Sequence, residues 1–129
     1  MQIKIYYEDT DAGGIVYHAN YLNYCERARS EFFFRKGKLP IINDSHFVVR
    51  KMDCDFVASA KFADNITVST KCIEIKKASF SVYHEIKREN TLLFKATVLL
   101  VLVNNGKVKR IDEEVKNTLE NLFNENENN

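Results

Sequence analysis

Most of the side chains that could do chemistry lie in one short stretch near the start of the chain. The stretch reads YYEDTDAGGIVYHANY from Tyr6 to Tyr21 and contains two carboxylates, Asp9 and Asp11, and one imidazole, His18. Aspartates that precede a helix commonly accept backbone N–H bonds, so each of these residues alone also fits a structural role as a cap or turn residue. Their density raises the question of an active site.

The stretch leads through a glycine pair, Gly13 and Gly14, into a predicted helix. The first N–H groups of a helix have no partner within the helix and lie at the positive end of its dipole. Around Val16 to His18 such groups are suited to bind a developing oxyanion, with the Asp11 carboxylate beside them as a base or nucleophile. Glycine also allows a ligand to approach the backbone closely. This is the minimum combination for acyl transfer or hydrolysis.

Spacing argues against three other kinds of site. A calcium loop that begins at Asp9 would have Gly13 at its fifth position and Asn20 at its twelfth, where a bidentate Glu is required. The glycines are not followed by the Lys-Ser/Thr pair of a nucleotide-binding loop. His18 and Cys25 are two helical turns apart, about 10 Å, which is beyond hydrogen-bond reach. We therefore expect no metal site, nucleotide loop or nucleophilic triad here.

Periodicity predicts the elements that hold this stretch. Residues 2–7 are rich in β-formers and predict a strand, which the turn-forming residues 9–14 end. From Asn20, the predicted N-cap, apolar residues recur at helical spacing until Gly37 and Pro40 stop the helix. The apolar side of this long helix is suited to being wrapped by a sheet.

After the helix the apolar residues alternate with a period of two, which predicts an antiparallel meander. Hairpin-type turns are expected at 89–90 and 104–106, and a change of phase between Cys72 and Ile73 indicates a bulge. His84 lies in phase with the apolar residues of its strand, so we expect a core histidine. A short helix over 112–123 closes the chain. The predicted fold class is α+β, a long helix wrapped by a five- or six-stranded antiparallel sheet.

Length and composition indicate a single soluble domain. The 129 residues predict one domain over 1–123, and the polar tail 124–129 has nothing apolar to bury, so we expect it to be disordered. Nineteen Lys and Arg nearly balance eighteen Asp and Glu, which argues against nucleic acid as a partner. Three widely spaced cysteines suit reduced thiols, and no apolar run approaches the length of a membrane span. We expect a cytoplasmic, unexported protein.

The chain contains the run Tyr7-Glu-Asp-Thr-Asp11-Ala-Gly-Gly-Ile-Val-Tyr-His18-Ala-Asn-Tyr21, followed by Cys25-Glu-Arg-Ala-Arg29. This run resembles the signature of the 4-hydroxybenzoyl-CoA thioesterase family of hotdog-fold enzymes. It is most similar to the bacterial acyl-CoA thioesterases associated with the Tol-Pal cell-envelope system. The resemblance implies a hotdog fold and hydrolysis of an acyl-CoA to a free acid and coenzyme A. No metal or cofactor is implied, since coenzyme A is part of the substrate.

The resemblance also assigns roles to residues. The family's catalytic carboxylate falls on Asp11, and the tyrosine and histidine of the motif fall on Tyr7 and His18. The backbone N–H that polarises the thioester carbonyl falls near His18, so we expect Val16 and Tyr17 to belong to the substrate-binding backbone. Together with Gly13 and Gly14, which allow the substrate to approach, these residues form the predicted site, whereas Asp9 is expected to be structural.

Family members join their sheets edge to edge as dimers and often pair again, so the resemblance implies a homodimer or homotetramer with acyl-CoA bound between subunits. Protein partners in the cell envelope or in phospholipid synthesis are implied by the resemblance alone. The chain departs from the family's usual sequence pattern at two places, Asp55-Phe-Val-Ala-Ser-Ala60 and Arg110-Ile-Asp112. Both differences concern the local shape of a loop.

Several alternatives stay open at this point. Asp11 can act as a nucleophile or as a general base, and the preferred acyl group is not specified. A hotdog hydratase or dehydratase would pair Asp and His for proton transfer on an acyl chain. A non-catalytic hotdog module would bind acyl-CoA or a protein without cleaving a thioester.

Overall fold

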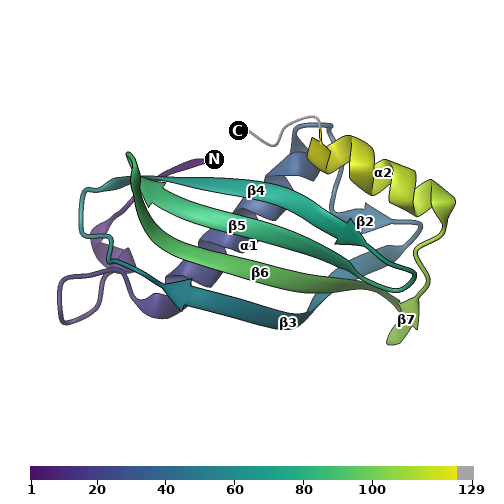
Figure 1. Cartoon of the computed structure of the whole chain (residues 1–129), viewed down its shortest axis with the longest axis horizontal. Helices are drawn as coiled ribbons and strands as arrows, with labels where there is room; N and C mark the ends of the chain where they lie inside the picture. The colour runs from purple at the N-terminus through teal and green to yellow at the C-terminus, as the bar shows by residue number, and fades with distance from the viewer. Residues whose placement is uncertain (125–129) are drawn as a thin grey trace.

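The structure, a computed structural model, describes residues 1–124 of the chain. The predicted tail lies outside the described residues except for Asn124, which is the last residue of the final helix. Figure 1 shows the elements, which in chain order are β1 (Gln2–Lys4), the short 3-10 helix η1 (Tyr7–Asp9), α1 (His18–Phe34), β2 (Ile41–Ile42), β3 (Ser45–Phe56), β4 (Asn65–Ile75), β5 (Phe80–Arg88), β6 (Thr91–Asn104), β7 (Lys107–Lys109) and α2 (Glu113–Asn124).

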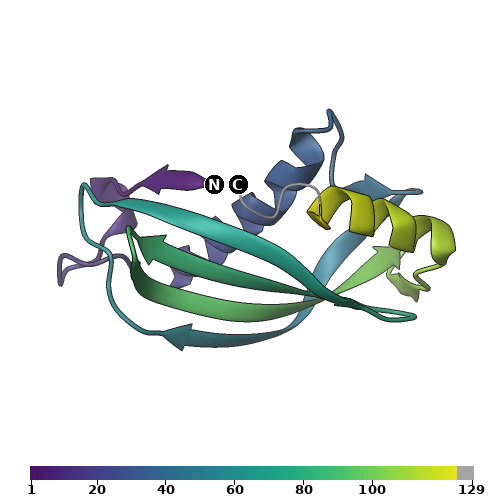
Figure 2. The ribbon, with the colours of Figure 1, turned by 45° about the horizontal axis from the view of Figure 1, so that its top comes forward.

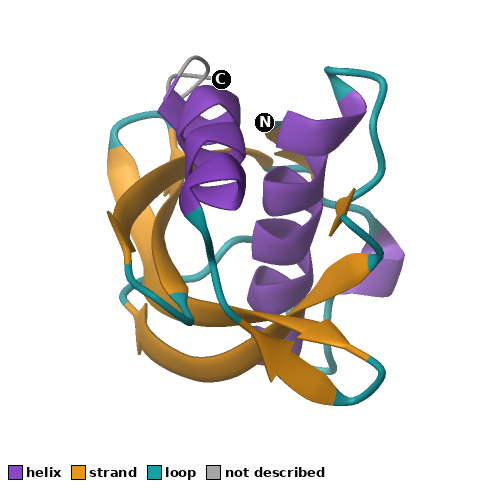
Figure 3. Ribbon diagram, turned by 90° about the vertical axis from the view of Figure 1, so that its right-hand side faces the viewer, coloured by secondary structure: helices purple, strands orange, loops and turns teal. Residues whose placement is uncertain are grey.

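The seven strands of the described chain form one antiparallel sheet in the order β1-β4-β5-β6-β3-β2, with β7 paired to β6. The sheet curves around α1 (Figure 2), and α2 lies beside α1 near one end of the sheet (Figure 3). The predicted number of strands was five or six. The difference comes from β2 and β7, whose two and three residues are too short to leave a clear alternation in the sequence.

Helix α1 crosses the concave side of the sheet because one of its faces is apolar. Its buried residues recur at helical spacing and include Tyr21, Cys25, Ala28 and Phe32. The helix ends at Phe34, and Gly37 has a φ of +69°, a left-handed conformation that favours glycine after a helix.

The predicted N-cap of α1 was wrong. The helix begins at His18, and Tyr17 is the N-cap without a side-chain capping bond. Asn20 lies inside the first turn, where its Nδ2 donates to the Asp9 carbonyl oxygen at 2.9 Å. Asn20 therefore connects the helix to the preceding loop, a long-range use of a side chain that often caps helices locally.

The first strand is shorter than the predicted span over 2–7. It ends at Lys4, and the chain turns into η1, where the Tyr6 N–H donates to Asp9 Oδ2 at 2.8 Å. An aspartate that accepts a backbone N–H three residues earlier competes with strand geometry. Asp9 thus overrides the β-propensity of the two tyrosines before it.

The meander agrees with the alternation in the sequence. The register of β4 against β5 shifts between Cys72 and Glu74, which confirms the predicted bulge. The turn between β6 and β7 has positive φ at both Asn105 and Gly106, as a two-residue hairpin requires. His84 is fully buried, as expected of a core histidine. The closing helix begins at Glu113, with Asp112 Oδ1 accepting the Val115 N–H at 2.9 Å.

Among residues 1–124 no helix is long and apolar enough to cross a membrane. The same residues contain no group of three or more His, Cys, Asp and Glu side chains placed to hold a metal ion. The three cysteines are free, with Cys25 buried and Cys54 and Cys72 half-buried.

Candidate active site

A cavity of about 240 Å³ lies where the glycine-containing loop, the start of α1 and the end of β3 meet. Two of the predicted catalytic side chains, Asp11 and His18, line it. The other lining residues are Ile15, Val16, Tyr21, Phe56, Val57, Ala58 and Ser59. The cavity therefore combines one carboxylate, one imidazole and a mainly apolar wall.

Asp11 is exposed and only partly engaged by its own loop. The Gly13 N–H donates to Asp11 Oδ1 at 2.8 Å, and no other group of the described chain bonds the carboxylate. One oxygen is thus held in place while the other has an open approach. A carboxylate fixed in this way is suited to act as a base or a nucleophile.

The two glycines serve Asp11 in different ways. Gly14 has a φ of +81°, so it supplies a backbone conformation that L side chains rarely adopt. Gly13 does not have a positive φ, but a Cβ placed on it would lie 3.2 Å from Asp11 Oδ1. Gly14 therefore makes the turn, and Gly13 leaves room for the carboxylate.

Asp9 is part of the scaffold, in agreement with its predicted structural role. Its carboxylate accepts the Tyr6 N–H, and its carbonyl oxygen accepts the Tyr17 N–H at 3.0 Å. The buried Tyr24 hydroxyl faces this carboxylate, and burial together with Asp9 raises the pKa of Tyr24. These contacts join the loop to α1 and leave Asp9 outside the cavity.

The backbone donors at the start of α1 differ from the prediction. The Val16 N–H donates to the Ala60 carbonyl oxygen at 2.9 Å, and the Tyr17 N–H donates to Asp9, so neither is available to a substrate. Within residues 1–124 the amides of His18 and Ala19 have no acceptor. Of the amides expected to be open from Val16 to His18, only that of His18 is open, and the Ala19 amide joins it, while the Val16 side chain still lines the cavity.

The predicted aromatic partners of the site lie in different places. The His18 ring lies against Tyr17 and meets Phe56 edge-on, with ring centroids 4.4 and 6.2 Å away. Tyr7 is 78% exposed and stacks on Phe62 instead of lining the cavity. The chain thus brings together Asp11 and His18 but not Tyr7.

Sequence reasoning missed Tyr21 and Phe56 as site residues. The Tyr21 ring stacks on Phe94, and its hydroxyl accepts the Ala60 N–H at 3.0 Å. Burial raises the pKa of Tyr21, which keeps it a neutral part of the wall. Its place in the helical stripe predicted only a core residue, because the same apolar face forms both the core and the floor of the cavity.

The loop after β3, which completes the rim, is held by an ion pair. Arg88 donates to the Ser59 carbonyl oxygen at 3.1 Å and to Asp64 Oδ2 at 2.8 Å. Partial burial favours the protonated form of Asp64, but the Lys61 N–H and Arg88 outweigh it and lower the pKa of Asp64. Arg88 is therefore occupied in positioning the rim.

Comparison with known proteins shows to which family the chain belongs. The family model of the thioesterase superfamily matches residues 13–95, which include the open amides at His18 and Ala19 and all of β3, β4 and β5. The chain belongs to the thioesterase superfamily. Its antiparallel sheet wrapped around one long helix is the hotdog fold of this superfamily, as the resemblance implied.

Individual members of the thioesterase superfamily are similar over most of the chain. An acyl-CoA thioesterase YbgC of Haemophilus influenzae is 38% identical over 126 residues, 93% of each chain. The Helicobacter pylori acyl-CoA thioesterase YbgC is 45% identical over 86 residues, which span 67% of this chain and 65% of that protein. The crystal structure of a probable thioesterase from Bartonella henselae has a TM-score of 0.81 at 32% identity and covers 87% of this chain and 97% of its own.

Proposed function

We propose that this chain is an acyl-CoA thioesterase that hydrolyses the thioester to a free acid and coenzyme A. The observation that carries the proposal is the cavity that Asp11 shares with His18 at the start of α1, where one carboxylate oxygen of Asp11 and the His18 N–H have no partner within residues 1–124. Its place in a thioesterase superfamily member, with relatives named as acyl-CoA thioesterases, supports the same chemistry.

The N–H groups of His18 and Ala19 are the proposed oxyanion donors. Donors that point at the carbonyl oxygen stabilise the negative charge that develops there when the carbonyl carbon is attacked. Because the amides sit at the positive end of the helix dipole, the field of α1 adds to this effect. In the neighbouring loop Gly14 makes the turn and Gly13 leaves room for the Asp11 carboxylate.

Two routes lead from this arrangement to the products. In the first, an Asp11 oxygen attacks the carbonyl carbon, the C–S bond breaks, the thiolate takes a proton from solvent, and water then hydrolyses the acyl anhydride. In the second, Asp11 takes a proton from a water molecule as that water attacks, and the C–S bond breaks directly. His18 is proposed to position water or to give a proton to the leaving sulfur. Neither route uses a metal or a cofactor.

We further propose that the active unit is a homodimer formed through β3. One edge of β3 pairs with β6 along most of its length, whereas β2 covers only Ser45 and His46 on the other edge. Residues 47–56 therefore present an open strand edge with exposed Val48 and Val49. Such an edge favours pairing with a second copy, which a two-fold axis would place antiparallel to the first.

The remaining expectations are part of the same proposal. A homotetramer would pair two such dimers, and the cytoplasm would keep the three free cysteines reduced. Tyr7, which does not line the cavity, has no proposed role within one chain.

The experiment that tests the proposed function is thiol release from a panel of acyl-CoA substrates, followed with a thiol reagent. We expect release above the uncatalysed rate for at least one acyl group. Hydration of an enoyl-CoA without thiol release would instead identify a hydratase. Saturable binding of acyl-CoA without turnover of any member of the panel would identify a binding module, and either result would refute the proposal.

A further inference from the structure

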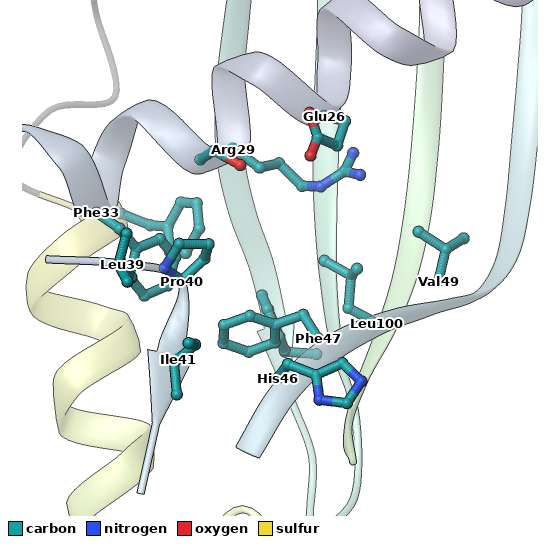
Figure 4. A pocket seen from close by; sticks show the side chains of 13 residues that line it. Glu26, Arg29, Phe33, Leu39, Pro40, Ile41, His46, Phe47, Val49 and Leu100 are labelled. Carbon is teal, nitrogen blue, oxygen red and sulfur yellow. The ribbon is translucent and has the colours of Figure 1, made fainter. Parts of the chain in front are cut away.

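A second cavity lies at the other end of α1, away from Asp11. It has a volume of about 370 Å³ and opens between the second half of α1, the segment before β2 and the beginning of β3 (Figure 4). We call it the Arg29 cavity. Its wall is mostly apolar and includes Phe33, Leu39, Ile41, Phe47, Val49 and Leu100. A volume of this size suits a small organic ligand.

Arg29 is the buried cation of this cavity. Only 9% of the residue is exposed, and its Nη1 donates to His84 Nε2 at 3.1 Å. No carboxylate of the described chain lies within 4.0 Å of the guanidinium. Its remaining N–H donors have no hydrogen-bond acceptor among residues 1–124, although the side chain lines the cavity. A buried cation without a counter-ion is costly, so this site favours an anion.

His84 does not supply the missing negative charge. A guanidinium can only donate, so His84 Nε2 is the acceptor and Nδ1 carries the proton toward Thr70 Oγ1 at 3.1 Å. The imidazole is therefore neutral and fully engaged. Glu26 also lines the cavity (Figure 4) and attracts the Arg29 charge, but it is exposed to solvent and lies beyond 4.0 Å from the guanidinium.

The proposed dimer brings the Arg29 cavity next to the active site of the other copy. Because β3 has a bulge between Val49 and Lys51, the regular positions of the open edge 47–56 are centred on Met52, and antiparallel pairing about that residue places Phe47 opposite Phe56 of the second copy. Phe47 lines the Arg29 cavity, and Phe56 lines the candidate active site. An acyl group held at one Asp11 can thus extend along the interface into the Arg29 cavity of the second copy.

We propose that the Arg29 cavity receives the distal end of the acyl group and that Arg29 binds a carboxylate at that end. The occupant is thus the CoA thioester of a dicarboxylic acid, whose methylene groups match the apolar wall and whose free carboxylate matches the cation. This inference rests on the proposed function, and it makes Arg29 a specificity-determining residue of the same reaction.

The test compares matched pairs of substrates, such as octanoyl-CoA with octanedioyl-CoA and butanoyl-CoA with succinyl-CoA. For at least one pair we expect a lower KM for the dicarboxylic thioester. Arg29→Gln, which keeps a donor for His84 but loses the charge, should raise that KM about tenfold and leave the neutral substrate's KM nearly unchanged. Arg29→Lys should restore part of the preference.

Two neighbours on α1 provide matched controls. Arg27 is exposed and lines neither cavity, so Arg27→Gln removes the same charge and should leave the preference intact. Glu26→Gln removes a negative charge from the Arg29 cavity and should lower the KM for the dicarboxylic thioester. Should Arg29→Gln fail to fold, competition on the unmodified protein decides, since free octanedioate should inhibit more strongly than octanoate.

The outcomes separate the two proposals. Three results would overturn this inference and leave the proposed function intact. They are thiol release with no preference for any dicarboxylic thioester, equal inhibition by the two free acids, and an equal effect of Arg29→Gln on the KM values of both substrates. No thiol release from any thioester would refute the proposed function, and this inference with it.

Discussion

Asp9 and Asp11 are two residues apart and have the same side chain, yet their surroundings give them different tasks. The carboxylate of Asp9 faces the Tyr6 N–H and the buried Tyr24 hydroxyl, so it is committed to the loop. The carboxylate of Asp11 is bonded at one oxygen only and lines a cavity. The difference arises from the surroundings of each carboxylate, since Asp11 keeps one oxygen open to the cavity whereas Asp9 lies outside it.

The two glycines beside Asp11 should respond differently to the same substitution. Gly13→Ala introduces a Cβ 3.2 Å from Asp11 Oδ1, so we expect kcat to fall about tenfold with little change in stability. Gly14→Ala meets no atom within 4 Å but forces a side chain into a positive φ, which should cost about 1 kcal/mol of unfolding free energy. Kinetics and urea denaturation of both variants measure the two effects. A pure stability loss in Gly13→Ala would contradict the assigned role.

Among the elements, α1 carries both the proposed oxyanion donors and the proposed specificity-determining residue. Its first turn presents the open amides of His18 and Ala19, and its fourth turn presents Arg29. The helix is attached to the sheet at this fourth turn by the buried contact of Arg29 with His84 of β5, which also contacts Thr70 of β4. Polar contacts of this kind fix the position of a helix that apolar packing alone would allow to slide.

His84 should make the stability of the protein depend on pH. Burial, and secondly Arg29, lower the pKa of His84 to about 3, well below its unfolded value of about 6.5. The unfolded chain therefore binds more protons, so this contribution is complete above the unfolded pKa and is lost as pH falls toward the folded pKa. Between pH 7 and pH 5 the loss should be about 2 kcal/mol.

Urea denaturation at several pH values checks the expected loss. His84→Gln keeps an acceptor for Arg29 but does not titrate, so its stability should change less with pH over this interval. His46→Gln, at an exposed position, is the control and should retain the slope of the unmodified protein. Equal slopes for His84→Gln and the unmodified protein would show that His84 is not the group responsible.

The elements that the sequence predicted well are those specified by their own periodicity. The alternation of β5 and the apolar stripe of α1 depend on neighbours within each element, so both were predicted from local pattern. The end of β1 and the start of α1 were misplaced because Asp9 and Asn20 bond to groups outside their own elements. Such contacts depend on the folded loop and leave no periodic signal.

In the candidate site, too, local sequence pattern predicted some residues correctly, while contacts between distant parts of the chain were missed. Asp11 and His18 were predicted, and they line one cavity because the loop between them is short. The Val16 amide was misassigned because its acceptor, the Ala60 carbonyl, is 44 residues away in the sequence, between β3 and β4. Only the folded sheet shows that this donor is occupied.

At the scale of the whole molecule, the open edge of β3 predicts a dimer of two 15.0 kDa chains. Pairing centred on Met52 places Val48 opposite Asp55 of the second copy. Val48→Glu would set like charges opposite each other twice per dimer and should weaken dimerisation about tenfold, whereas Val48→Lys should not. Sedimentation over a range of concentrations measures the effect, and identical behaviour of both variants would argue against this pairing.

The central claim, that Asp11 performs the chemistry in a thioesterase, is tested most directly by the turnover of Asp11→Asn on the best acyl-CoA of the panel. The amide has nearly the same shape and can still accept the Gly13 N–H through its oxygen, so the fold should persist, as circular dichroism and urea denaturation can verify. We expect kcat to fall at least about a hundredfold, because neither attack nor proton removal is available to an amide. A folded Asp11→Asn variant with near-unmodified turnover would contradict the account.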